Sequence, residues 1–201
     1  MMPTVQSLIA ELDEVLLRAS RTQLMSILQR VTDLFVERAE TYSNDHVAVF
    51  DEVLGRLVGK AERPELIELS DRLAPVGNAP TNVVDHLARH DDIAISGPIL
   101  LKSNAVKDQT LAAVAKEKSE KHLSMIAGRD QLGETVTDVL VDRCSLEVAC
   151  KVTGNQGASL SELGFVKLIN RAKDDKVLAS AIESRHDLPP ELQPFLKLAL
   201  T

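Results

Sequence analysis

The segments GRDQL (residues 128–132) and SRHDL (residues 184–188) decide the fold, because the chain around them repeats. Aligned without a gap, the two regions pair basic with basic and apolar with apolar residues: Arg129 with Arg185, Leu132 with Leu188, Val136 with Leu192, Val139 with Phe195 and Leu140 with Leu196. A loop followed twice by the same apolar spacing indicates one structural unit that the chain uses more than once.

Similar short loops recur along the chain, at APVGNAP (residues 74–80), KSNAVKD (102–108) and GNQGA (154–158). Successive loops are separated by 26, 26, 25 and 31 residues when measured between Asn78, Asn104, Asp130, Asn155 and His186. Apolar helical segments flank each loop, and such a period is typical of an α-solenoid, in which neighbouring units cover one another's apolar faces. A helical bundle with short loops gives a similar spacing by chance, so this alternative stays open.

The composition independently predicts an all-α fold. Of the 201 residues, 44% are apolar and 26% are charged, which is the balance of a soluble globular domain. The chain has 29 leucines and 20 alanines, which favour helices. Among the aromatic residues that enrich sheets, it has one tyrosine, four phenylalanines and no tryptophan.

We therefore predict an α-solenoid of short helical pairs preceded by a small N-terminal helical bundle. Residues 1–62 form the segment that caps the solenoid and residues 63–201 hold about five short units, all within one continuous domain. Amphipathic stripes at residues 5–17, 24–35 and 47–58 form the bundle, with a capping box at Ser20 and Gln23. A second capping box at Ser159 predicts another helix start, and Pro98 predicts a helix that begins late or kinks.

Several short segments, in the same order and at similar spacing, resemble a known family. They are FDEVL (residues 50–54), RLAP (72–75) with NAP (78–80), KS (118–119) with HL (122–123) and IAGR (126–129), TVTDVLV (135–141), GA (157–158) with Ser161 and GF (164–165), and residues 185–190. Over roughly residues 24–190, the chain is similar to the uncharacterised alphaproteobacterial proteins grouped as domain of unknown function 2336. The resemblance implies HEAT-like helical pairs in a bacterial protein, and it brings no established activity and no catalytic residue.

The charge pattern disfavours two classes of partner. With 30 acidic and 23 basic side chains the net charge is −7, and the cations are spread along the chain. Nucleic-acid phosphates repel such a chain, and its few aromatic residues offer little stacking surface for bases. No apolar run has the ~18 residues that a membrane span needs, and no secretory signal is found. We therefore expect a cytoplasmic protein that binds neither nucleic acid nor membrane.

No motif indicates catalysis or a cofactor. His86 and His90, four residues apart on a predicted helix, are a weak zinc candidate, because the glutamate of a zinc-protease helix is missing between them. A solvated helix face explains the two histidines better. Cys144 and Cys150 are expected as free thiols, the first where two helices meet and the second in the core. We predict no catalytic residue, no metal and no cofactor.

Two mixed-charge clusters contain the candidate partner-binding residues: Lys116, Lys118 and Lys121 in the first, and Arg171 and Lys173 in the second. Each cluster alone is typical of solvated surface. If both lie along one edge of the solenoid, they form an extended surface for a charged partner. We therefore predict a non-enzymatic protein-interaction scaffold or adaptor, whose protein partner and pathway the sequence leaves unidentified.

Two alternatives stay open. Small HEAT-like DNA glycosylases show that such repeats can host an enzyme, although the acidic charge and the absence of tryptophan disfavour that activity here. The second alternative is a self-associating structural protein. Leu12, Leu16 and Leu17 leave apolar surface on the first predicted helix, through which a homodimer can form.

Overall fold

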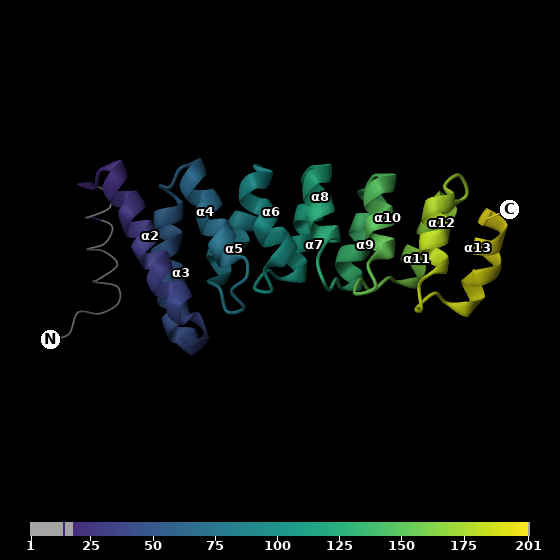
Figure 1. The fold of residues 1–201 in the computed structure, drawn as a ribbon, viewed down its shortest axis with the longest axis horizontal. Coiled ribbons are helices and arrows are strands. Elements are labelled where there is room, and N and C mark those ends of the chain that lie inside the picture. The colour runs from purple at the N-terminus through teal and green to yellow at the C-terminus, as the bar shows by residue number, and fades with distance from the viewer. Residues whose placement is uncertain (1–13, 15–17, 201) are drawn as a thin grey trace. The chain divides into compact units, whose positions relative to one another are not determined.

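A computed structural model describes residue 14 and residues 18–200 of the chain (Figure 1). These residues form 12 α-helices and no strand, which confirms the predicted all-α class. No helix in this part of the chain is both long enough and apolar enough to cross a membrane. In chain order the helices are α2 (Arg21–Arg38), α3 (Asn44–Val58), α4 (Arg63–Leu73), α5 (Thr81–Ala88), α6 (Ile93–Lys102), α7 (Asp108–Glu117), α8 (Glu120–Ala127), α9 (Glu134–Arg143), α10 (Leu146–Gly154), α11 (Glu162–Ala172), α12 (Lys176–Glu183) and α13 (Gln193–Leu200), with short 3-10 helices at Ala39–Thr41 and Pro190–Leu192.

The helices group into two compact units. The first comprises the described residues up to Ile99 together with Ser103–Val106, and the second comprises Leu100–Lys102 together with the residues from Lys107 onward. Helix α6 therefore contributes residues to both units. The predicted division after residue 62 concerns where the repeats begin, and it stays a prediction.

In the first unit, two helices pack against the helix two places further along the chain, α2 against α4 and α3 against α5. The sequential neighbours α2 with α3 and α4 with α5 also contact each other. Apolar side chains at helical spacing fill the space between these helices, and Phe35, Leu54, Leu73 and Leu87 are fully buried. Burial of each such side chain contributes about 1.5–3 kcal/mol to folding.

Both local and distant side chains cap the helices of the first unit. The predicted capping box is confirmed at the start of α2, where Ser20 and Gln23 exchange side-chain to backbone hydrogen bonds. Helix α5 has no capping side chain of its own. Asp51, buried in α3, takes that role, because its carboxylate accepts from the backbone N–H groups of Asn82 and Val83 at 3.1 and 2.9 Å. This contact fixes the start of α5 against α3.

The second unit stacks its helices in two rows (Figure 1). One row, which we call the odd row, contains α7, α9, α11 and α13, each packed against the next. The other row contains α8, α10 and α12 in the same arrangement. Pairs such as α9 with α10 and α11 with α12 join the two rows. In a helical repeat protein, neighbours stack in this way because each helical pair covers the apolar face of the next.

Helix α6 corrects one expectation about helix boundaries. It starts at Ile93 and runs through Pro98, so the expectation of a late start is wrong, while the alternative of a kink at the proline stays a prediction. The apolar residues on either side of the proline, Ile95 and Ile99, are fully buried. The free energy gained by burying these apolar side chains offsets the loss of the backbone hydrogen bond that proline cannot make in a helix.

The loops before α9 and before α11 are bonded to each other. Leu132 donates its N–H to the carbonyl oxygen of Gly157 at 3.1 Å and accepts from the N–H of Ser159 at 2.8 Å, which forms an isolated parallel bridge. The predicted capping box at Ser159 is therefore wrong, because that residue belongs to the bridge. Ser161 caps α11 instead and accepts from the N–H of Gly164 at 2.9 Å.

This bridge requires a glycine at residue 157 but not at residue 154. A Cβ atom on Gly157 would lie 1.9 Å from the carbonyl oxygen of Asp130, whereas one on Gly154 meets nothing within 4 Å. We expect Gly157→Ala to lower the free energy of unfolding by about 3 kcal/mol. Gly154→Ala, at the end of α10, should raise it by about 0.5–1 kcal/mol. Urea unfolding of both variants measures the difference, and equal effects would contradict the close packing at the bridge.

Candidate interaction surface

Side chains in four of the five recurring loops bond to the turn one helical pair earlier. In the first unit, Asn78 donates to the carbonyl oxygen of Ala39. In the second, Arg129 donates to the carbonyl oxygen of Leu100 at 2.8 Å, and Asn155 donates to that of Arg129 at 2.6 Å. The accepting carbonyls lie at or just beyond helix C-termini, where four C=O groups lack a donor within the helix. Each of these side chains thus supplies a donor to carbonyl groups of the preceding turn.

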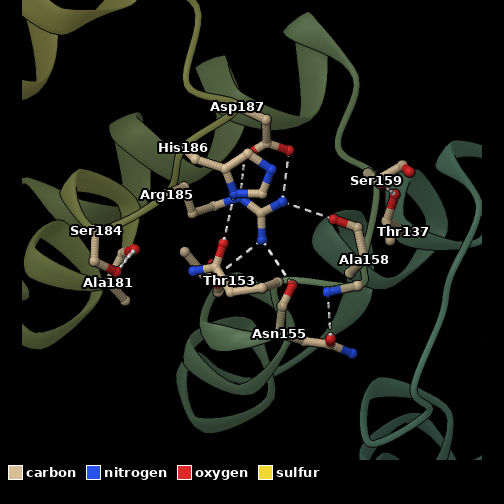
Figure 2. Close-up of polar contacts among 12 residues, drawn as sticks. Thr137, Thr153, Asn155, Ala158, Ser159, Ala181, Ser184, Arg185, His186 and Asp187 are labelled. Carbon is tan, nitrogen blue, oxygen red and sulfur yellow. Dashed lines mark hydrogen bonds and ion pairs between the residues drawn. The ribbon is translucent and has the colours of Figure 1, made fainter.

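Arg185 makes the fullest of these ties (Figure 2). Its guanidinium donates to the carbonyl oxygens of Thr153 at 3.0 Å, Asn155 at 2.8 Å and Ala158 at 2.7 Å. Asp187 accepts from Nε and Nη2 of the same guanidinium at 2.7 and 2.6 Å. Only 4% of Arg185 is exposed. A buried cation is costly unless it is paired and hydrogen-bonded, and both conditions are met here.

A second set of arginines ties the helices of the odd row together. Arg143, in the last turn of α9, donates to the carbonyl oxygen of Ala115 near the end of α7. Arg171, in the last turn of α11, donates to the carbonyl oxygens of Val141 and Cys144 at the end of α9, both at 2.9 Å. The matching contacts define equivalent positions in neighbouring helices of the row, with Arg143 equivalent to Arg171.

The predicted partner-binding residues lie at two places along this row. Lys116, Lys118 and Lys121 surround the turn from α7 into α8, where the first and last are exposed and Lys118 is half-buried. Lys173 is exposed directly after α11. Arg171 is half-buried, and its two terminal nitrogens bind backbone carbonyls of α9. The structure therefore uses Arg171 to hold the row together, and the exposed cations of the two clusters are lysines.

The two histidines of the zinc candidate lie in and just after α5. His86 is exposed, and His90 accepts the backbone N–H of Asp92 at Nδ1, at 3.0 Å. Among the residues that the structure describes, no group of three or more His, Cys, Asp or Glu side chains is arranged to hold a metal ion. Within this part of the chain the pair has no third protein ligand.

Both cysteines are free, but their burial differs from expectation. Cys144 lies between α9 and α10 as predicted and is buried, whereas Cys150 is only half-buried and is not a core residue. Burial raises the pKa of the Cys144 thiol, and a hydrogen bond from Arg171 at 3.6 Å offsets this rise only in part. A thiol that stays protonated is a poor nucleophile. Burial therefore acts against reactivity of the Cys144 thiol.

The outward face of the odd row carries exposed apolar side chains. Leu168 of α11 and Leu196 of α13 are buried, which marks the inward face of each helix. At about 100° per residue, Leu163, Val166 and Leu198 project from the opposite side of their helices, with Phe195 on the flank. Their exposed fractions are 59%, 39%, 75% and 60% for Leu163, Val166, Leu198 and Phe195. Helices α11 and α13 pack against each other, and we call these four residues together the apolar patch.

Sequence reasoning missed the apolar patch because apolar residues at helical spacing predict a core. The signal was nevertheless present in α11, where Leu163, Phe165, Val166, Leu168 and Ile169 place apolar groups around most of the helix. Only Phe165, Leu168 and Ile169 are buried. When apolar residues cover more of a helix than the protein core can bury, the remaining apolar face is available to contact another surface.

A family model described as "Uncharacterised protein conserved in bacteria (DUF2336)" matches residues 95–195. No curated protein and no solved structure matches the chain. The matched range contains the four arginines that tie the second unit and three of the four residues of the apolar patch. The segments at residues 50–80 that resemble the same family lie outside it.

We expect Arg185→Ala to lower the free energy of unfolding by about 3–5 kcal/mol, because Asp187 and three backbone carbonyls lose their partner. The matched control is Arg89→Ala, since Arg89 forms an exposed ion pair with Asp85 one helical turn earlier. That change should lower the free energy of unfolding by less than about 0.5 kcal/mol. Chemical unfolding compares the two variants, and similar losses would show that the Arg185 contacts add little.

The contact with Arg185 also predicts a pH dependence. Burial acts to raise the pKa of Asp187, but the hydrogen bonds and charge of Arg185 outweigh it, so that the pKa lies below its ordinary value of 3.8. Folding therefore favours the carboxylate, whose contribution is present above pH 3.8 and is lost as the pH falls through the lower folded value. In thermal unfolding, Asp187→Asn should unfold at a lower temperature than the wild type at pH 7, and the difference between the two unfolding temperatures should shrink in acid. A difference that does not change with pH would contradict the lowered pKa of Asp187.

Proposed function

We propose that this chain, which belongs to the DUF2336 family of uncharacterised bacterial proteins, is a non-enzymatic scaffold that binds a protein partner. The proposal rests on the apolar patch of α11 and α13, since neighbouring large apolar side chains exposed on a soluble protein mark interaction sites. It includes HEAT-like repeats and an alphaproteobacterial family, as the resemblance of the loops implies. It also includes a cytoplasmic location, in keeping with the composition.

The arginine ties support binding on this surface because they preorganise it. A surface that changes little on binding loses less conformational entropy, and more of the contact energy remains as affinity. Arg143 and Arg171 connect the ends of three successive helices of the odd row. Helix α11, which carries Leu163 and Val166, is thus held in register with α9 by side-chain to backbone hydrogen bonds.

The exposed lysines are a second contact region within the same proposal. Lys116 and Lys121 lie at the turn between α7 and α8, and Lys173 lies two helices further along the odd row. Exposed charges of this kind steer association and set its salt dependence more than they add affinity. We therefore assign most of the binding energy to the apolar patch, and to the lysines the steering of a separate, acidic segment of the same partner.

Affinity capture with the tagged chain, from a lysate of a bacterium that encodes it, tests the scaffold function. We expect a reproducible protein partner that Leu163→Asp no longer captures, because a buried unpaired carboxylate at the contact is costly. Val177→Asp, at an exposed valine of α12 outside the odd row, is the control and should retain the partner. Charge reversal to Glu at Lys116, Lys118 and Lys121 measures the contribution of the lysines.

Capture of nucleic acid or of small molecules alone would contradict the scaffold function and return attention to an enzyme, including the DNA-glycosylase alternative. The homodimer predicted through Leu12, Leu16 and Leu17 falls outside the described residues. Light scattering of the purified chain distinguishes a monomer of 21.9 kDa from a dimer.

A further inference from the structure

Carboxylates border the apolar patch. Because Arg143 of α9 is equivalent to Arg171 of α11, the residues before them can be paired by counting back along each helix. One residue back, Asp142 is equivalent to Asn170. Five residues back, Asp138 is equivalent to Val166. The outward face of α9 therefore carries Asp138 and Asp142 where α11 carries Val166 and Asn170. Asp138 also approaches α11, because its Oδ1 accepts from the hydroxyl of Ser161 at 2.6 Å.

Two further carboxylates extend the border. Glu162 is exposed next to Leu163 in the first turn of α11. Glu191 is exposed in the short 3-10 helix just before α13. The cations near the patch are Lys167, which is paired with Asp142, Lys173 directly after α11, and Lys197 in the last turn of α13. The four carboxylates still outnumber these three lysines, so the border of the patch is net negative.

The exposure of the two patch residues on α11 does not arise from a missing neighbour within the row. Helix α11 contacts α9 on one side and α13 on the other, and it still leaves Leu163 and Val166 exposed. On α13, Leu198 lies two residues, about 200°, from the buried Leu196, which places it on the outward side of its helix. A further helix added along the row would leave this face open, so its occupant must approach from outside the row.

We propose that the apolar patch binds a basic amphipathic helix of a partner protein, an inference that rests on the scaffold function. The apolar side of such a helix, spaced i, i+3, i+4 and i+7, would cover Leu163, Val166, Phe195 and Leu198. Its lysines or arginines would lie against Asp138, Asp142 and Glu162, where opposite charges favour encounter and orientation. One of these cations would compete with Lys167 for Asp142.

Charge also argues against a second copy as the occupant. A symmetric dimer would place the same patch on both sides of the interface and bring two net negative borders together. Like charges at an interface suppress association. The net charge of −7 on the whole chain acts in the same direction. A basic segment carries a charge opposite to that of the patch border and opposite to the net charge of the whole chain.

The test is selection of 20-residue peptides from a displayed random library on the immobilised wild-type chain, with Leu163→Asp as the depletion target. We expect enriched peptides with net positive charge and apolar residues at helical spacing. For a synthetic enriched peptide, fluorescence anisotropy should show affinity about tenfold weaker for Leu163→Asp and unchanged for Val177→Asp. The double variant Asp138→Asn with Asp142→Asn should weaken binding about three- to tenfold and reduce its salt dependence.

Each other outcome has a distinct meaning. Enriched peptides that depend on Leu163 but carry no net positive charge would overturn the basic helix and leave the scaffold function standing. The absence of any Leu163-dependent peptide would overturn the inference about the patch, while lysate capture decides the scaffold function separately. A change from dimer to monomer in light scattering with Leu163→Asp would assign the patch to a second copy. Circular dichroism of each variant confirms that it is folded.

Discussion

The backbone carbonyl groups at the helix C-termini are the constraint on which the rest of this structure depends. Helices α7 to α13 are only 8 to 11 residues long, so the last four C=O groups, which lack a donor within the helix, are a large share of each. Arg129, Arg143, Arg171 and Arg185 supply donors from the next helical pair. A buried carbonyl left unpaired costs about 1–3 kcal/mol, so each pair depends on its neighbour.

The same constraint shapes the surface. The tying arginines add to the count of basic residues, but their side chains donate to backbone carbonyl groups rather than facing solvent. The positive charge of Arg185 is also neutralised by Asp187. Around α9, α11 and α13 the exposed charge is therefore set mainly by carboxylates and a few lysines. An apolar patch with a negative border on a rigid row of helices is suited to binding a segment of opposite charge, and no catalytic group is needed for that function.

Features that depend on nearby residues could be predicted, and features that depend on distant ones could not. The capping box of α2 was predictable because Ser20 and Gln23 lie one turn apart. The capping role of Ser161 was not, because the bridge between two loops displaces Ser159 from it. The capping of α5 by Asp51 was equally unpredictable, because α4 separates Asp51 in the sequence from the backbone N–H groups that donate to it. For the candidate surface, the lysine positions were predictable from the sequence, and the apolar patch was not.

By itself, the sequence determined the all-α class and the recurrence of the loops, because helical periodicity and turn residues act over a few neighbouring positions. It also contained the arginines, without showing what they bind. Only the tertiary structure decided that Arg171 holds two helices together while Lys173 stays in solvent, and that Leu163 is exposed while Leu168 is buried. The physical reason is that the role of a side chain depends on which carbonyl or helix lies opposite it, and stacking of the helical pairs sets that.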